Sequence, residues 1–239
     1  MTAISKTYDI TTVVTAHNEG LLFGKTMNSL AVAVEHAQKN GLSVEMVFCL
    51  DNPDALTSRM VKENSNGSEV LEFDFKDQGI VRNEAIRIAK GTYIALLDGD
   101  DLWSFNWLTE AYSLAKQDKK FIVHPAFNWY FEGSNNILKI IDQDSELFDQ
   151  DFLRVGNYWD ALCFCHKEVY GMCPYGQRDI EKGFAYEDWH WNCETIVQGF
   201  KHKVAKNTVH FKRRRTISQT ILASQREALI RNTKLLEYY

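Results

Sequence analysis

Three carboxylates stand close together near the middle of the chain, directly after an apolar run. Asp98, Asp100 and Asp101 follow residues 94–97, and only Gly99 separates the first two. Like charges this close repel unless a cation, hydrogen-bond donors or water offset them. Asp98 and Asp100 could both face a ligand that Gly99 lets the backbone approach closely, and hard oxygen ligands suit Mg²⁺ or Mn²⁺. A cap on the following helix is the alternative, above all for Asp101.

A second acidic pair, Glu187 and Asp188, opens a predicted helix in the C-terminal half. The helix dipole alone favours carboxylates in a first turn, so the pair could be purely structural. The neighbouring Trp189, His190 and Trp191 favour a functional interpretation, because aromatic rings stack on the apolar faces of sugars. One positioned carboxylate is sufficient to take the proton of a hydroxyl group.

The elements that must position these acids alternate between strand-like and helix-like patterns. Strands are predicted at 10–16, 44–50, 69–75, 93–97 and 121–131, and helices at 21–39, 55–63, 79–90 and 105–115. Such alternation is typical of βαβ units with a mostly parallel sheet flanked by helices. The fold class is therefore α/β and Rossmann-like, and ligands are expected beyond the carboxyl ends of the strands.

Polar side chains follow three of these strands at that edge of the sheet. Thr15, His17 and Glu19 end the first strand, Asp51 ends the second, and the acidic cluster at 98–101 ends the fourth. Their convergence predicts one ligand site. A G-x-G-x-x-G phosphate loop is missing, so a dehydrogenase-type nucleotide site is not supported.

The C-terminal half has a looser pattern, with many turns and aromatic residues over 132–186. A helix follows from about 187, then a strand at 202–211, a dense basic segment at 212–218 and an amphipathic helix from about 219 to 236. We expect a single domain over 1–239. It divides into an N-terminal half at 1–131, a second half at 132–218 and a C-terminal helix at 219–239.

Composition excludes several classes of protein. The net charge of −5 argues against a nucleic-acid partner and against general attraction to anionic membranes. Five cysteines and no signal peptide indicate a reduced, cytoplasmic protein. No apolar run reaches the roughly 20 residues that cross a bilayer.

Five segments of this chain resemble, in order, the family 2 glycosyltransferases, whose fold is called GT-A. They are "VVTAHNEG" at 13–20, "EMVFCLDNPD" at 45–54, "GIVRNEAIRIAKGTYIALLDGDD" at 79–101, "AYEDWHWN" at 185–192 and "HFKRRRTIS" at 210–218. The resemblance implies inverting transfer of a hexosyl or N-acetylhexosaminyl group from a nucleotide-sugar to an acceptor hydroxyl, with Mn²⁺ or Mg²⁺ as cofactor.

The resemblance also implies a metal site on the D-x-D motif. Asp100 would be the main ligand, and Asp98 would meet the ribose or the metal. His210 would complete the site, as a C-terminal histidine does in some relatives; a packed strand histidine is the alternative. The cation would neutralise the donor pyrophosphate as the nucleoside diphosphate leaves.

For the nucleoside, the resemblance implies that Asp51 pairs with the base, commonly uracil, which points to a UDP-sugar. The alternative is a turn cap, and Leu50 and the Asn52-Pro53 turn depart from the family's usual acids and Gly-Ser turn. Thr15 and His17 would surround the nucleoside, with His17 in place of a stacking aromatic. Glu19 would touch the donor or cap the next helix.

Arginines could meet the pyrophosphate, because guanidinium matches phosphate geometry. Arg82 and Asn83 open the helix below the cleft, where a surface ion pair is the alternative for Arg82. The run 213–215, with Arg214 as the donor-binding candidate, would clamp the pyrophosphate or an anionic acceptor, unless it is a solvated patch. Ser218 matches the family segment without an evident role.

By the same resemblance Asp188, beside Glu187, would be the catalytic base. Acceptor-binding candidates are Trp159, Trp189, His190 and Trp191. The acceptor would be a glycan or lipid-linked glycan, with bacterial surface polysaccharide synthesis as the default biology. Peripheral docking to a membrane or partner could use the basic segment and the C-terminal helix, and the chain could be one domain of a longer polymerase.

Two other functions remain open from the sequence. A nucleotidyltransferase also combines a Rossmann-like half with acidic metal ligands, although it normally has a Gly-rich phosphate loop near its N-terminus. A noncatalytic domain that binds a nucleotide or a sugar would keep the fold without turnover. Asp100 and Asp188 argue against that second alternative.

Overall fold

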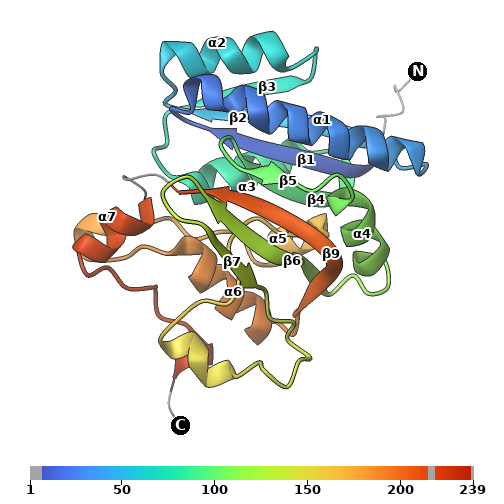
Figure 1. Ribbon diagram of the computed structural model, residues 1–239. Helices are drawn as coiled ribbons and strands as arrows, with labels where there is room; N and C mark the ends of the chain where they lie inside the picture. The colour runs from blue at the N-terminus through green and yellow to red at the C-terminus, as the bar shows by residue number, and fades with distance from the viewer. Residues whose placement is uncertain (1–6, 215–218, 238–239) are drawn as a thin grey trace, which may run out of the picture.

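The computed structural model describes residues 7–214 and 219–237, which build one nine-stranded mixed sheet with helices on both faces (Figure 1). The strand order is β3-β2-β1-β4-β8-β6-β9-β5, and β7 pairs with β6. The strands are β1 Tyr8–Ala16, β2 Val44–Asp51, β3 Glu69–Phe73, β4 Gly91–Asp98, β5 Leu102–Trp103, β6 Phe121–Phe131, β7 Asn136–Lys139, β8 Phe164–His166 and β9 Lys201–Arg213.

The helices lie between these strands largely where the periodicity predicts them. The α-helices are α1 Phe23–Lys39, α2 Ala55–Asn64, α3 Gln78–Ile88, α4 Trp107–Ala115, α5 Lys167–Met172, α6 Glu187–Val197 and α7 Gln219–Gln225. Short 3-10 helices are η1 Gly20–Leu22, η2 Gln150–Arg154, η3 Ile180–Lys182 and η4 Lys234–Leu236. Asp54 and Asp77 cap α2 and α3 by accepting backbone N–H bonds, which satisfies donors that a helix start leaves free.

The first four strands of the chain that alternate with helices form the parallel part of the sheet. β1 lies between β2 and β4, with Thr15 opposite Asp98, and β3 is the outer strand. Residues of β1 point alternately into two apolar layers. Ile10 and Val14 pack with α1 and α4 on one face, and Val13 packs with α3 and α5 on the other. Each fully buried side chain of this size stabilises the fold by about 1.5–3 kcal/mol.

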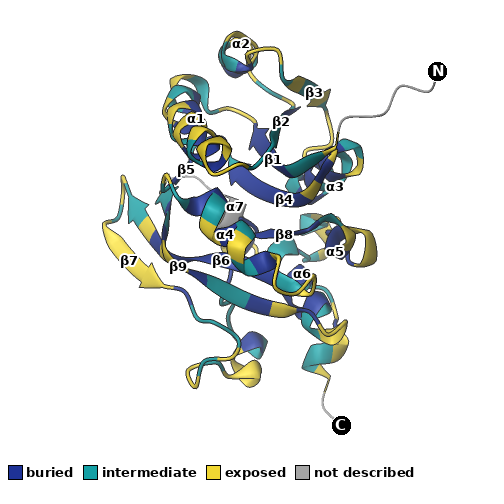
Figure 2. Ribbon diagram, turned by 90° about the vertical axis from the view of Figure 1, so that its right-hand side faces the viewer, coloured by how far each residue is buried: buried dark blue, intermediate teal, exposed yellow. Residues whose placement is uncertain are grey.

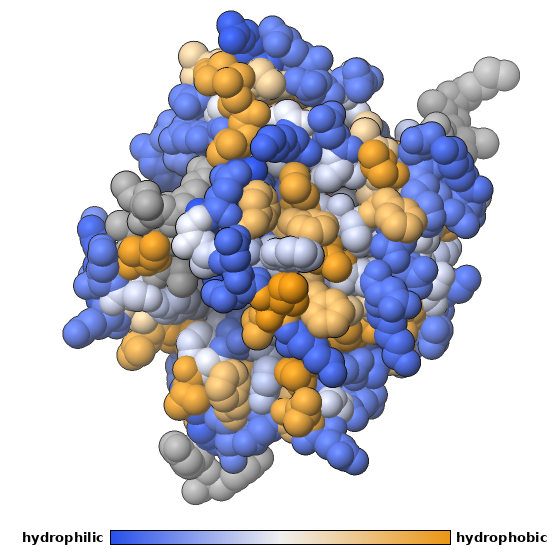
Figure 3. Space-filling model, in the orientation of Figure 1, coloured by the Kyte–Doolittle hydropathy of each residue, from blue (hydrophilic) through white to orange (hydrophobic). Residues whose placement is uncertain are grey.

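Antiparallel pairing enters in the second half of the sheet. β8 lies antiparallel between β4 and β6, while β6 and β9 run parallel. The outer face of β6, β7 and β9 carries Phe127, Trp129 and Ile137, all exposed. Figure 2 shows β7 exposed along its length, and Figure 3 shows apolar side chains gathered over these strands. Alternation then turns Asn128 and Leu138 to the opposite face, toward the cavity described below.

The C-terminal segment differs from its prediction. The helix expected from about 219 to 236 ends at Gln225, and Glu227 has a positive φ of 51°. Beyond that turn Leu229 pairs with the loop before α6, accepting the N–H of Ala185 and donating to the carbonyl of Gly183. Backbone pairing thus replaces the apolar helix face that the periodicity indicated. None of the described helices has the length and apolar character needed to cross a membrane.

Candidate active site

A cavity of about 490 Å³ opens where β4 ends, between that strand, the ends of β6 and β9 and the start of α6. Its wall is rich in charge of both signs. The charged residues that line it are Arg82, Asp98, Asp100, Asp101, Asp160, Arg178, Glu187, Asp188, Lys212, Arg213 and Arg214. Both acidic groups found in the sequence are therefore brought to one cavity.

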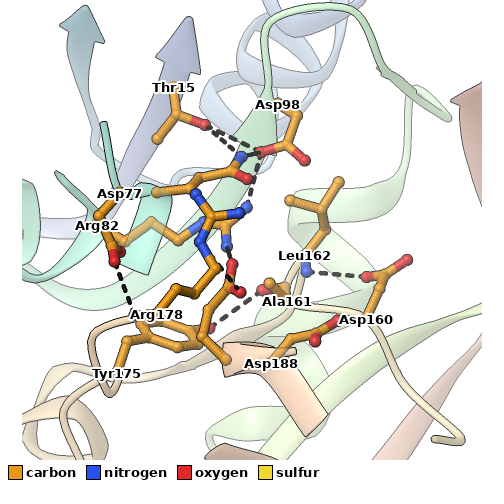
Figure 4. A network of polar contacts seen from close by, with 12 residues as sticks. Thr15, Asp77, Arg82, Asp98, Asp160, Ala161, Leu162, Tyr175, Arg178 and Asp188 are labelled. Atoms are coloured by element: carbon orange, nitrogen blue, oxygen red, sulfur yellow. Dashed lines mark hydrogen bonds and ion pairs between the residues drawn. The ribbon is translucent and has the colours of Figure 1, made fainter. Parts of the chain in front are cut away.

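Asp98 is held by donors on a single oxygen. Its Oδ1 accepts from Thr15 Oγ1 at 2.9 Å, from Gln78 Nε2 at 2.6 Å and from Arg82 Nη2 at 2.9 Å (Figure 4). The side chain is 24% exposed. These three donors fix the position of the carboxylate. Among the described residues they leave Oδ2 as the oxygen of Asp98 that can meet a ligand.

Asp101 has a different set of partners from Asp98. It is 4% exposed, its Oδ1 accepts the backbone N–H of Arg213 at 2.8 Å, and its Oδ2 lies 2.8 Å from Lys212 Nζ. Burial raises the pKa of Asp101 to about 7, although Lys212 opposes that shift. Asp101 therefore anchors β9 instead of capping the following helix. Asp100 lines the cavity between these two acids.

Arg82 connects the D-x-D strand to the helix that carries the second acidic pair. Its Nη1 lies 3.7 Å from Glu187 Oε1 while its Nη2 holds Asp98, and its side chain is 3% exposed. Arg178 Nε lies 3.8 Å from the other oxygen of Glu187. Burial opposes the charge of Arg82, but the carboxylates of Asp98 and Glu187 hold its pKa above the ordinary value. Arg82 thus forms a buried ion pair with Asp98 and not a surface ion pair.

Asp188 lines the cavity one residue beyond Glu187. Burial and, after it, the charge of Glu187 raise the pKa of Asp188 to about 7. The backbone N–H of Trp189, 2.8 Å from Oδ1, opposes this rise. A carboxyl group with a pKa near the working pH is suited to general base catalysis. Nearby Asp160 behaves in the opposite way. Burial would raise the pKa of Asp160, but Lys212 and other nearby groups lower it to about 2.

The residues predicted to surround the nucleoside form a network at the ends of β1 and β2, outside the cavity lining. Asp51 accepts the backbone N–H groups of Phe75, Lys76 and Asp77, so it organises the loop after β3. His17 Nδ1 lies 2.6 Å from the carbonyl oxygen of Asp51. The carboxylate of Glu19 accepts the backbone N–H of His17.

Asn83 and Gly99 have structural partners in place of the expected ligand contacts. The amide of Asn83 exchanges two 2.9 Å hydrogen bonds with the backbone of Tyr175. Gly99 donates its N–H to Thr15 O at 2.7 Å, and a Cβ on Gly99 would lie 3.0 Å from that oxygen. Its small size therefore serves the close approach to β1.

The four acceptor-binding candidates lie in different places in the structure. Trp189 lines the cavity and donates from Nε1 to Leu153 O. The prediction for Trp191 is wrong, since it is 1% exposed and stacked in the core. Trp159 borders the cavity but is 2% exposed, with its ring stacked on His202. His190 faces a separate small hollow beside Arg231.

His210 does not reach the cavity, so the structure contradicts its predicted role as a metal ligand. Its ring is fully buried and packs against Trp107, with ring centroids 4.4 Å apart, and against Trp103. Within the described part of the chain neither ring nitrogen has a hydrogen-bond partner. Burial lowers the pKa of His210 to about 3, which keeps the ring neutral.

The basic segment is only partly available to a ligand. Arg213 pairs with Glu132 through its guanidinium group and donates its backbone N–H to Asp101, and its side chain is 1% exposed. Arg214 lines the cavity, with its guanidinium carbon 4.1 Å from the centre of the Tyr130 ring. The predictions for Arg215 and Ser218 fall outside the described residues.

Comparison with known proteins identifies the family. The profile of "Glycosyl transferase family 2" matches residues 11–171, which include the ends of β1 and β2 and the D-x-D motif at the end of β4. The chain belongs to this family. No curated protein sequence matches it.

Solved structures of another transferase confirm the predicted GT-A fold. S. aureus TarS 1–349 in complex with UDP-GlcNAc superimposes with a TM-score of 0.69 at 13% identity, over 89% of this chain and 60% of that one. The same fragment with UDP gives a TM-score of 0.67 at 14% identity, over 86% and 60% of the two chains. This family 2 chain thus spans about 60% of the length of the TarS fragment.

Family 2 transferases typically use a divalent cation, and two residues of this chain fit one. Asp98 and Asp100 both line the cavity, and their carboxylate oxygens are hard ligands. Among residues 7–214 and 219–237 no cluster of three His, Cys, Asp or Glu could hold a metal. A cation would therefore depend on two carboxylates, the phosphates of its substrate and water. When bound it would neutralise a diphosphate.

Sequence reasoning missed four residues of this site: Gln78, Asp160, Arg178 and Lys212. Asp160 and Arg178 lie in the loosely patterned region, where no periodicity marks them. Gln78 directly follows the cap of α3, and a helix start that faces a strand end is a signal that could have found it. Lys212 lies two positions after His210 on β9, so strand alternation could have suggested it.

Proposed function

We propose that this family 2 chain is an inverting, metal-dependent glycosyltransferase that uses a UDP-sugar, with Asp188 as its base. The observation that carries the proposal is the placement of Asp188 and the D-x-D acids in one cavity, Asp188 with a pKa raised to about 7. Such a group takes a proton near neutral pH, while the hard carboxylate oxygens of Asp98 and Asp100 suit a cation on a diphosphate.

The donor would occupy the side of the cavity at the ends of β1 and β4. Asp98 and Asp100 would hold Mn²⁺ or Mg²⁺, with Thr15 and Arg82 fixing Asp98 from behind. The network of Asp51, His17 and Glu19 would face the nucleoside, because Oδ2 of Asp51, which accepts the N–H of Asp77, keeps acceptor capacity beside that bond. The complex of TarS with UDP-GlcNAc supports a uridine donor carrying a hexosyl or N-acetylhexosaminyl group.

The chemical step follows from these positions. Asp188 takes the proton of an acceptor hydroxyl as its oxygen attacks the anomeric carbon. The bond from that carbon to the phosphate oxygen breaks, and the nucleoside diphosphate leaves with the electron pair. Attack opposite the leaving group inverts the anomeric centre. Glu187, held by Arg82 and Arg178, orients the first turn of α6.

The acceptor would be a glycan or lipid-linked glycan that enters over Trp189 and Arg214, in bacterial surface polysaccharide synthesis at the cytoplasmic side of the membrane. The half at 1–131 would bind the donor and the half at 132–218 the acceptor. Peripheral docking through the basic segment and a long C-terminal helix has less support, because Lys212 and Arg213 pair inside the protein and α7 has seven residues.

Calorimetric titration of uridine, guanosine and cytidine diphosphates with Mn²⁺, followed by an assay of UDP-sugar turnover, tests the proposal. Selective binding of UDP with release of an inverted sugar product is the expected result. Preference for another base would overturn the uridine assignment. Binding without turnover on any acceptor or water would favour a noncatalytic binding domain.

A further inference from the structure

Lys212 is a partly buried cation in the wall of the cavity. Its Nζ lies 2.8 Å from Asp101 Oδ2 and 3.3 Å from Asp160 Oδ2, and its side chain is 15% exposed. An ammonium group has three N–H donors, and these two contacts use two of them. The third can meet a ligand in the cavity that Lys212 lines.

The surroundings of Lys212 keep it charged. Burial opposes the charge, but Asp101, Asp160 and Asp98 together hold the pKa of Lys212 well above its usual value. The ammonium is fixed from both sides before a ligand arrives. Preorganised charge of this kind stabilises a developing anion without the cost of reorientation.

The path of β9 places Lys212, and not His210, at this wall of the cavity. Positions 210 and 212 lie on the same face of the strand, two residues apart. The ring of His210 is enclosed by Trp103 and Trp107, while Lys212 lies beyond them at the cavity. A divalent cation would then have the carboxylates of Asp98 and Asp100 as its protein ligands, because the described residues hold no cluster of three such groups.

We propose that Lys212 is a resident cation of the donor site, whose ammonium binds the diphosphate of the nucleotide-sugar and stabilises its charge as it leaves. The inference rests on the proposed function and deepens it. Diphosphate binding then has two sources of positive charge, a divalent ion on Asp98 and Asp100 and the fixed ammonium of Lys212. Part of the affinity persists when divalent ions are removed.

A purely structural role is the competing explanation, since Lys212 also offsets two acids. The chain offers a matched control on the same strand. Lys203 Nζ lies 2.6 Å from Asp142 and 3.0 Å from Asp144, and its side chain is likewise 15% exposed, but it does not line the cavity. Lys203→Met removes a doubly paired ammonium without touching the site.

The experiment is calorimetric titration of UDP and of uridine into the wild type, Lys212→Met and Lys203→Met, each with Mn²⁺ and with chelator. We expect the wild type to keep measurable UDP affinity in chelator and Lys212→Met to lose at least about tenfold of it, the loss of one charge-assisted contact. Lys203→Met should match the wild type, and uridine should bind all three proteins equally.

Lys212→Met leaves Asp101 and Asp160 without their cation, so its folding is checked by thermal unfolding. If it does not fold, the Asp101→Asn/Lys212→Met double variant, which removes both members of the shorter ion pair, takes its place. Equal UDP affinity of the wild type and the variant in chelator, or no wild-type binding without Mn²⁺, would overturn the role of Lys212 and leave the proposed function standing. Failure of any nucleoside diphosphate to bind with Mn²⁺ would instead refute the proposed function.

Discussion

The two walls of the cavity surround their carboxylates differently. On the wall formed by α3 and β4, Asp98 receives three hydrogen bonds on one oxygen, one of them from an arginine. On the wall formed by α6, Asp188 is largely removed from water, receives one backbone N–H and has the carboxylate of Glu187 beside it. Donors thus fix the position of Asp98 at one wall, whereas burial and a like charge raise the pKa of Asp188 at the other.

In the proposed function this difference lets one cavity hold a cation at one wall and accept a proton at the other. The donors on Oδ1 fix the position of Asp98, while burial and the charge of Glu187 raise the proton affinity of Asp188. A carboxylate held by donors suits an ionic ligand, and a carboxyl group with a raised pKa suits the acceptor hydroxyl.

The largest expected effect comes from Asp188→Asn, which abolishes the proton acceptor on one wall and leaves the other intact. Transfer should fall about 10²–10⁴-fold, the usual contribution of a general base. UDP affinity should stay within about twofold of the wild type, as measured by calorimetry beside a steady-state assay. Transfer at a near-normal rate would remove Asp188 as the base.

Arg82→Met breaks the bridge between the walls and leaves Asp98 and Glu187 without a shared cation. Breaking a buried ion pair costs about 3–5 kcal/mol of unfolding free energy. The control is Arg87→Met on the same helix, where an exposed pair with Glu84 is worth under about 1 kcal/mol. Urea unfolding compares the two variants. Equal stability of both would show that the Arg82 bridge does not hold the fold.

The pH dependence sharpens the contrast between the walls. Because Asp188 must be ionised to accept a proton and burial raises its pKa to about 7, kcat should fall as pH drops below about 7. Glu187→Gln removes a like charge, so it should move this acid limb to lower pH. A pH profile of kcat checks both shifts. An unmoved limb in Glu187→Gln would contradict the electrostatic role of Glu187.

The smallest effect is expected at Trp189, the aromatic that stays at the cavity. Trp189→Ala should raise the acceptor KM about threefold to tenfold, since one aromatic contact is worth about 0.5–1.5 kcal/mol. Trp191→Ala is the contrast, because its ring lies in the core and its loss should lower stability instead. Steady-state kinetics and thermal unfolding separate the two tryptophans. A KM unchanged in Trp189→Ala would exclude Trp189 from the acceptor site.

The fold of the N-terminal half could be predicted because its signals are local. The alternation of apolar strands with capped helices places Thr15 and Asp98 at one edge, and the structure pairs them directly. His210 could not be placed in this way. A strand pattern gives the face of a residue but not how far along the strand the cavity begins, which depends on Trp103 and Trp107 packing from another segment.

Local sequence patterns also could not predict the contacts of Lys212 or the course of the C-terminal segment. The partners of Lys212 are Asp101 and Asp160, both far away in the sequence, and Asp160 lies where no pattern exists. Helical periodicity after residue 225 competes with backbone pairing of Leu229 to Gly183 and Ala185, and the pairing wins. Long-range contacts of this kind leave no local trace.

The attachment of the C-terminal segment also sets an order of assembly during translation. Leu229 pairs with the loop before α6, Ser224 contacts Tyr186 at the start of that helix, and Ala223 lines the cavity. Domains generally fold from the N-terminus as the chain emerges from the ribosome, so β1 to β4 can pair while these residues are still unmade. Residues 223–229, which complete the wall carrying Asp188, are synthesised well after the strands against which that wall is built.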